Sequence, residues 1–194
     1  MSPLLIAYSL WAGFALVWNI AGRWTATPAV ETLAARRERR YELVLAGGLI
    51  LIVLAPVNAA ARRLWTSPPG LDWLMLVVVT AGLACCWWAR LHLGRLWSAE
   101  VTRKTGHRIV ETGPYRLVRH PIYTGFIVCY MGLAMLSATT FGFAGLVLAS
   151  MGLWLKAREE ERFLAQAVDS HEYAEYRKRT PMLMPRLSRS GTRT

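Results

Sequence analysis

The amino-acid sequence predicts an all-α integral membrane protein with five transmembrane helices. Of its 194 residues, 54% are hydrophobic and nine are tryptophan, and the mean hydropathy is +0.28. Several apolar runs approach the roughly 20 residues that a helix needs to cross the hydrocarbon core of a bilayer. The basic residues are also distributed unevenly among the connections between these runs. A chain of this length is expected to form a single domain.

The apolar runs give the expected order of elements along the chain. The expected spans are Pro3–Ala21, Tyr41–Ala60, Leu71–Ala89, Pro121–Ala138 and Phe141–Leu155. The connection between the last two is so short that they are expected to form a helical hairpin, with one re-entrant pair as the alternative. Residues 25–40 are expected to form a loop and a short interfacial helix. Within the single domain, residues 1–90 hold the first three spans, residues 91–185 form the catalytic region with C-terminal amphipathic helices on the cytoplasmic side, and residues 186–194 form a disordered tail.

The charges predict the orientation of the chain. The sequence contains 23 Lys and Arg against 12 Asp and Glu, for a net charge of +11. Five crossings place all of the basic residues except Arg62 and Arg63 on one side of the membrane. The positive-inside rule then predicts an external N-terminus and a cytoplasmic C-terminus, and the basic side is attracted to anionic lipid. This placement disfavours nucleic acid as a partner. No basic region precedes the first apolar run, so no cleaved signal peptide is expected.

A dense polar cluster lies between Gly113 and Gly125, where the fourth apolar run begins. Pro121 suits the first position of a helix, which places His120 at the cap. The unpaired N–H groups of such a helix start attract anions, including carboxylates, and the guanidinium of Arg119 suits bidentate binding of a carboxylate. Interfacial anchoring alone explains single Tyr, Arg or Trp residues. It explains this cluster of two Tyr, two Arg and a His less well.

A second group of polar residues follows the fifth apolar run. On a helix, Glu160 and Glu161 share a face with Leu164, whereas Glu159 turns away. A carboxylate on a packing face usually has a cationic partner. Two alternatives stay open: an intrahelical pair, either Lys156–Glu160 or Arg158–Glu161, or a ligand that supplies a cation, hydroxyls or amines.

Other chemistries find little support in the sequence. Four histidines and three cysteines show no metal-ligand spacing, so no metal is expected. The cysteines fall within apolar runs and are expected to pack as small hydrophobic residues. The sequence also lacks a phosphate-binding Gly-rich loop and a Gly-x-Ser-x-Gly nucleophile motif.

Several motifs together resemble the isoprenylcysteine carboxyl methyltransferase family, which belongs to a wider group that includes phospholipid methyltransferases. The resemblance covers roughly Leu93–Pro185 and rests on residues 93–98, 107–115, 119–125 and the Glu160-Glu161 pair. The family joins Arg-His-Pro-x-Tyr-x-Gly to a downstream Arg-x-x-x-Glu-Glu-x-x-Leu. Here Lys156 replaces the leading arginine of the second motif, and residues 168–170 replace the usual Phe-Gly before the tail that matches at residues 172–181.

The resemblance implies that S-adenosylmethionine binds at the cytoplasmic face of the membrane. The residues implied to line the cofactor are His107, Val110, Gly113, Tyr115, His120, Pro121, Tyr123, Glu160 and Glu161. Arg119, His120 and Tyr123 are the expected catalytic residues. With a carboxylate acceptor, Arg119 would orient the acceptor and no general base would be needed. With an amine or thiol acceptor, His120 or a glutamate would become the candidate base.

The expected function is methyl transfer from S-adenosylmethionine to a lipid-associated acceptor. One such acceptor is the carboxylate of an isoprenylated cysteine, and the expected partners are the bilayer and a lipophilic or prenylated substrate. The alternatives are a phospholipid N-methyltransferase, a membrane NADPH-dependent reductase of the sterol reductase type, and a non-enzymatic membrane scaffold.

Overall fold

The computed structural model describes residues 1–24, 29–32, 35–57, 63–94, 102–104, 110–167 and 170–186. The long helices are α1 (Pro3–Trp24), α2 (Ala35–Leu54), α3 (Pro69–Leu93), α4 (Pro121–Ser137) and α5 (Thr140–Ala167). The shorter elements are β1 (Ala29–Thr32), β2 (Thr102–Lys104), the 3₁₀ helix η2 (Gly113–Arg116) and α6 (Ser170–Arg179). The expected helical class is therefore confirmed for the described residues. The pairing of β1 with β2 is an addition that the sequence did not predict.

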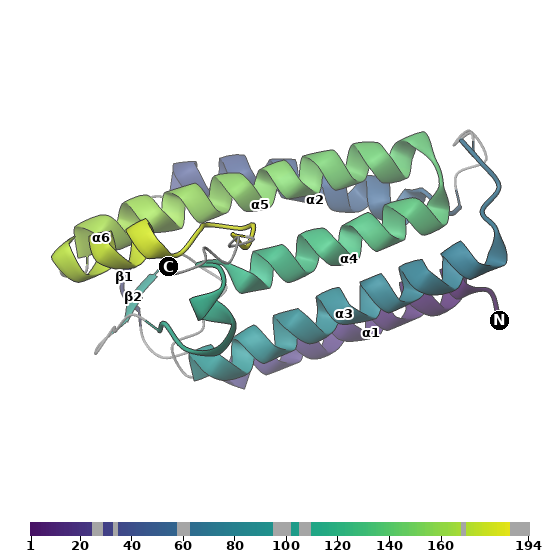
Figure 1. The fold of residues 1–194 in the computed structure, drawn as a ribbon. Helices are drawn as coiled ribbons and strands as arrows, with labels where there is room; N and C mark the ends of the chain where they lie inside the picture. The colour runs from purple at the N-terminus through teal and green to yellow at the C-terminus, as the bar shows by residue number, and fades with distance from the viewer. Residues whose placement is uncertain are drawn as a thin grey trace, which may run out of the picture.

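The long helices lie side by side with alternating directions (Figure 1). The most extensive helix contacts join α3 to α4 and α2 to α5, whereas α1 packs mainly against α3. The N-terminus and the link between α4 and α5 lie at one end of the bundle, and α6, η2 and the strand pair lie at the other (Figure 1). The bundle therefore has two distinct ends, and the polar cluster of the sequence lies at the α6 end.

The helix bounds depart most from the expected spans in α2 and α5. Helix α2 begins at Ala35 and ends at Leu54, several residues earlier than the apolar run at residues 41–60. The run at residues 141–155 and the amphipathic segment after it form one continuous helix, α5, of 28 residues. Nothing in the segment around Lys156 breaks a helix, because it lacks Gly and Pro and is rich in good helix formers. The two glutamates are therefore carried on the end of a long helix.

Three helices in the described part of the chain are long and apolar enough to cross a membrane: Pro3–Gly22, Gly70–Leu93 and Thr140–Ala165. Helix α4 is apolar but has 17 residues. Helix α2 has the required length, with Arg39, Arg40 and Glu42 in its first half. A multi-pass membrane protein is thus supported, and the number of five crossings stays a prediction.

Glycines permit close contact between α3 and α4. A Cβ on Gly82 of α3 would lie 2.6 Å from the carbonyl oxygen of Gly125 on α4, and a Cβ on Gly125 would lie 2.7 Å from the carbonyl oxygen of Gly82. Small residues allow helix backbones to approach closely in lipid, where apolar burial between helices provides little driving force. This contact fixes the first turns of α4 against α3.

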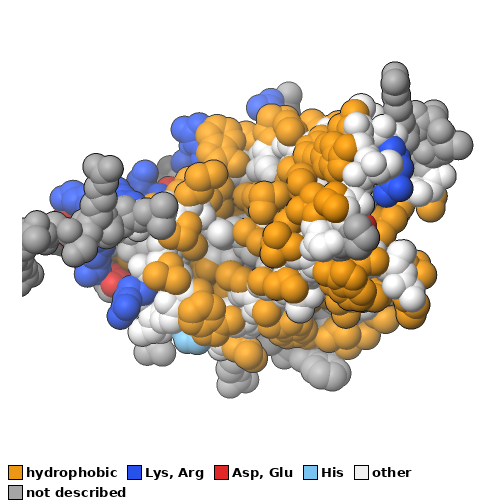
Figure 2. All heavy atoms as spheres, turned by 45° about the vertical axis from the view of Figure 1, so that its right-hand side comes forward, with side chains coloured by type: hydrophobic (Ala, Val, Ile, Leu, Met, Phe, Trp, Pro, Cys, Tyr) orange, Lys and Arg blue, Asp and Glu red, His pale blue; other side chains and the backbone are white. Residues whose placement is uncertain are grey.

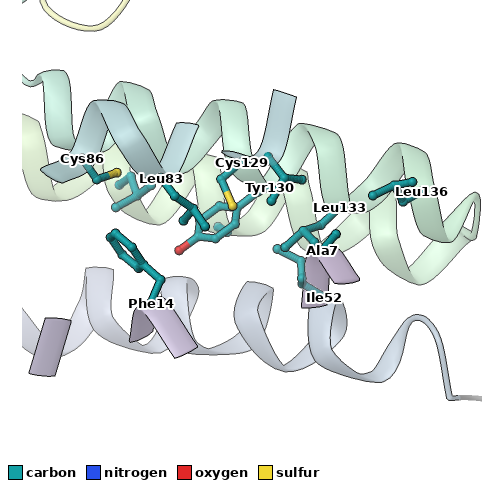
Figure 3. Close-up of a cluster of buried hydrophobic side chains, with 12 residues drawn as sticks. Ala7, Phe14, Ile52, Leu83, Cys86, Cys129, Tyr130, Leu133 and Leu136 are labelled. Carbon is teal, nitrogen blue, oxygen red and sulfur yellow. The ribbon is translucent and has the colours of Figure 1, made fainter. Parts of the chain in front are cut away.

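The interior and exterior of the bundle are both apolar. Figure 3 shows Phe14, Leu83, Cys86, Cys129 and Tyr130 meeting in the interior, and these residues belong to one buried cluster. On the outside, hydrophobic side chains cover the middle of the face seen in Figure 2. Large apolar residues are well exposed there and elsewhere on the surface, among them Val77 at 63% and Val147 at 64%. A continuous apolar exterior of this kind is typical of a surface that contacts lipid.

Candidate functional site

The chain reaches the start of α4 through a tight turn at Gly113. This glycine has a φ of +58°, and a Cβ there would lie 2.3 Å from the imidazole ring of His92. Glycine is therefore required both by the backbone conformation and by the space. The 3₁₀ turn η2 follows, and His120 caps α4, which begins with Pro121 as predicted.

The segment after α6 runs along this helix start. The backbone N–H of Arg119 donates to the carbonyl of Pro181 at 2.9 Å, and that of His120 donates to the carbonyl of Met182 at 3.1 Å. The hydroxyl of Thr124 donates to the carbonyl of Leu183 at 2.7 Å. We call residues 180–183 the C-terminal strap. The residue types of the strap do not indicate this role, because main-chain hydrogen bonds leave no signature in the sequence.

The two glutamates of α5 meet the start of α4. The hydroxyl of Tyr123 donates to Oε1 of Glu160. The ring of His120 lies between the two carboxylates, with Nδ1 3.3 Å from Oε2 of Glu160 and Nε2 3.3 Å from Oε1 of Glu161. The structure therefore brings together the two polar groups that are separated by about 40 positions in the sequence.

Arg119 is held by several partners at once. Its Nε and Nη2 atoms lie 2.7 and 2.6 Å from Oε1 of Glu161, and Nη1 donates to the carbonyls of Arg177, at 3.1 Å, and Thr180. The Arg119 side chain is 10% exposed. Arg177 of α6 adds a contact of 3.6 Å between its Nε and Oε2 of Glu161. Orienting an acceptor carboxylate would require Arg119 to exchange these partners, so this expected role stays a prediction.

Of the other charged residues of α5, Arg158 and Arg162 face outward, whereas Glu159 is only 18% exposed and does not turn to water as the helical pattern predicted. Glu159 pairs with Arg162 at 2.6 Å, and Arg162 is 59% exposed. The guanidinium of Arg158 lies 4.7 Å from the ring centroid of Trp154, which is itself 38% exposed. The ion pairs of Glu161 in the described residues therefore come from α6 and the start of α4, instead of from Arg158 within its own helix.

The environment of His120 determines its charge. Burial of the ring lowers the pKa of His120, but hydrogen bonds to Glu160 and Glu161 and the charges of both carboxylates outweigh this effect and raise the pKa above its usual value. In the protonated ring both nitrogens are donors, which matches a carboxylate on each side. An imidazolium in this position cannot accept a further proton.

Two further expected site residues, Val110 and Tyr115, lie next to this network. Tyr115 and Val110 belong to a small apolar cluster with Ile122 and Tyr123. The backbone carbonyl of Tyr115 accepts a hydrogen bond of 2.7 Å from the hydroxyl of Tyr176. Burial raises the pKa of both tyrosines, so both hydroxyls stay protonated. His107 lies outside the described residues. Within the described part of the chain, no three His, Cys, Asp or Glu side chains form a group that could hold a metal ion.

Comparison with known proteins identifies similar sequences. Residues 73–166 match the isoprenylcysteine carboxyl methyltransferase family. The chain is 36% identical over 126 residues to the cobalt-zinc-cadmium resistance protein CzcN of Cupriavidus metallidurans. The aligned region covers 64% of this chain and 53% of that protein. It is 32% identical over 120 residues to the nickel-cobalt-cadmium resistance protein NccN of Alcaligenes xylosoxydans xylosoxydans, covering 60% and 54%. The chain thus spans about half the length of these two relatives.

A plant relative is matched over a larger share of both chains. The chain is 26% identical over 155 residues to a probable protein-S-isoprenylcysteine O-methyltransferase of Oryza sativa subsp. indica. The aligned region covers 80% of this chain and 68% of that protein. The family resemblance of the motifs is therefore confirmed, and the matched region includes every described residue of the network except those of α6 and the strap.

Proposed function

We propose, from the match of residues 73–166 to the isoprenylcysteine carboxyl methyltransferase family, that the protein is an integral membrane methyltransferase acting on a lipid-associated acceptor. The observation that carries this proposal is the contact of Arg119, His120 and Tyr123 with Glu160 and Glu161 at one end of an apolar bundle. Such a buried polar network at the edge of a lipid-facing surface suits chemistry on a substrate held in the membrane.

We assign S-adenosylmethionine as the methyl donor; when bound, it supplies an electrophilic methyl group on a sulfonium sulfur. The residue types at the site fit its functional groups. Glu160, whose side chain is 21% exposed, suits an ammonium group or ribose hydroxyls, and the start of α4 suits a carboxylate. The proposed cofactor-binding set is the one expected from the sequence, including His107, with Arg119 holding Glu161 in place.

The geometry of His120 favours an acceptor that needs no base. A carboxylate oxygen attacks without losing a proton, whereas an ammonium or a thiol must first be deprotonated. Because both nitrogens of His120 face carboxylates, its ring is a poor candidate for that base. This supports the carboxylate of an isoprenylated cysteine over an amine or thiol acceptor. The comparisons offer no support for the phospholipid N-methyltransferase or the reductase.

The donor is tested by calorimetry on the detergent-purified protein with S-adenosylhomocysteine and, separately, with NADPH. We expect binding of S-adenosylhomocysteine and at least about tenfold weaker binding by Glu160→Gln, since one charge-assisted contact contributes 1.5–3 kcal/mol. Glu175→Gln is the matched control, because Glu175 pairs on the surface with Lys178. Binding of NADPH alone would reject the proposal in favour of the reductase.

The acceptor is tested on membranes that contain the protein. After incubation with methyl-labelled S-adenosylmethionine, we expect label in a fraction that is released by mild base, as a methyl ester is. Label that resists base and stays with phospholipid would identify N-methylation and overturn the proposed acceptor.

A further inference from the structure

Residues on α2 and α5 indicate the depth of the site in the membrane. On α2, exposed Arg39 and Arg40 precede the buried Tyr41. On α5, Trp154 is paired with the guanidinium of Arg158 on the outer surface. Trp and Arg side chains of this kind gather at the boundary between headgroups and hydrocarbon. The stretch of α5 from Trp154 to Arg158 therefore lies at the headgroup level in the proposed orientation.

Lys156 lies within this stretch but faces the interior. Its Nζ is 5.8 Å from the ring centroid of Tyr41 and 5.9 Å from that of Tyr123. These distances are within the range of a cation–π contact. Lys156 therefore joins α2, α4 and α5, and one of its aromatic neighbours is the tyrosine that donates to Glu160.

Lys156 and Arg119 lie next to different glutamates. Lys156 precedes Glu160 by four residues, about one helical turn or 6 Å toward the hydrocarbon. Arg119 is bound to Glu161 and to the carbonyls of Arg177 and Thr180, next to α6. A donor arriving from water and an acceptor arriving from lipid would thus meet different cations.

We propose that Lys156 is the specificity-determining residue for the methyl acceptor, because its ammonium holds the carboxylate of a lipid-borne acceptor at the headgroup level beside Tyr123. This inference rests on the proposed function and refines it. An ammonium of this kind pairs with a single carboxylate oxygen as a point charge and leaves the second oxygen available to the methyl group. The expected role of Arg119 in orienting the acceptor then passes to Lys156, and Arg119 acts as a positioning residue through Glu161.

The test measures binding of N-acetyl-S-farnesylcysteine and of its uncharged carboxamide to the full chain in detergent. We expect the wild-type protein to prefer the carboxylate by about tenfold, an energy typical of one charge-assisted contact. Lys156→Met should bring the two affinities within about twofold, and Lys156→Arg should restore the preference. Arg158→Met is the matched control, because Arg158 lies two residues away and faces outward.

Binding of S-adenosylhomocysteine by the same preparations shows that each variant is folded and that the donor site is intact. A Lys156→Met variant that keeps the preference for the carboxylate would overturn the inference. An equal loss in Arg158→Met would overturn it as well, since the effect would then be one of general surface charge. If the wild-type protein binds the donor analogue but shows no preference for the carboxylate, the inference fails while the proposed methyltransferase function stands.

Discussion

At the scale of single residues, Glu161 carries the largest number of charged contacts in the described site. Its carboxylate faces Arg119, His120 and Arg177, and its side chain is 8% exposed. A buried ion pair contributes little relative to an apolar pair, but removing one partner leaves an uncompensated buried charge. The buried guanidinium of Arg119 therefore makes Glu161 difficult to replace.

We expect Glu161→Gln to destabilise the protein by about 3 kcal/mol, because Arg119 then stays buried without its counter-charge. The measurement is the free energy of unfolding in detergent. Glu175→Gln, which breaks an exposed pair with Lys178, should change stability by less than about 1 kcal/mol. Equal effects of the two substitutions would show that the network around Glu161 contributes no more to the free energy of unfolding than an exposed ion pair does.

The charge of His120 gives the stability a defined pH dependence. Its pKa is raised in the folded protein, so its contribution is fully present below the unfolded pKa near 6.5 and is lost as the pH rises through the raised folded value. The groups around the ring are Tyr123 on α4, Glu160 and Glu161 on α5, and Arg119 beside it, with Arg177 of α6 on Glu161. Among these groups, His120 is thus the one whose ionisation is expected to change as the pH rises above 6.5.

We expect the thermal unfolding midpoint of the wild-type protein in detergent to decrease as the pH is raised from 6 to 9. The midpoint of His120→Gln should vary less over the same pH range. Glutamine keeps one donor and one acceptor but no titrating group. A fall of the same size in His120→Gln would assign the pH dependence to other groups.

At the scale of elements, the sequence predicted the helical regions better than their ends. Pro121 marked the start of α4 correctly, because proline constrains the first turn of a helix in a way that is local to the sequence. The continuity of α5 across the membrane boundary was missed. Hydropathy changes at residue 156 while the backbone conformation does not. The roles of α6 and the strap were missed because their contacts with α4 are long-range.

A single added methyl group should disturb the packing of α3 against α4. We expect Gly82→Ala to destabilise the protein by about 1–3 kcal/mol, because the new Cβ would lie 2.6 Å from a backbone oxygen and 2.7 Å from a backbone nitrogen of α4. Gly13→Ala on α1 is the matched control, since nothing lies within 4 Å of its Cβ position. The free energy of unfolding and the affinity for S-adenosylhomocysteine should both fall in Gly82→Ala. Neither quantity should change in Gly13→Ala.

At the scale of the whole molecule, the two ends of the bundle differ in chemistry. The connection before α3 meets the α4–α5 link, where the N–H of Leu64 donates to the carbonyl of Ala138 at 2.7 Å. The N-terminus lies at the same end (Figure 1). The opposite end holds the network of Arg119, His120 and the glutamates. The distribution of Lys and Arg predicted this separation, because each apolar run of suitable length reverses the side on which the next connection lies.

The orientation and the number of crossings can be tested together by labelling cysteines in intact cells with a membrane-impermeant maleimide. The wild-type protein is the blank, since Cys86 and Cys129 are fully buried and Cys85 is partly buried in α3. We expect Ser2→Cys and Arg63→Cys to be labelled in intact cells, and Lys178→Cys only after permeabilisation. Lys178 is 73% exposed, so failure to label it cannot be attributed to burial.

Arg63 distinguishes the two ways of counting spans. With five crossings the connection between α2 and α3 lies outside, together with the N-terminus. If only α1, α3 and α5 crossed, the N-terminus and α6 would still lie on opposite sides, but Arg63 would lie inside. Labelling of Ser2→Cys without Arg63→Cys would therefore reduce the crossings to three and place the end of α2 on the inner side of the membrane. The hydrogen bond between Leu64 and Ala138, which joins the two connections at the N-terminal end, favours five.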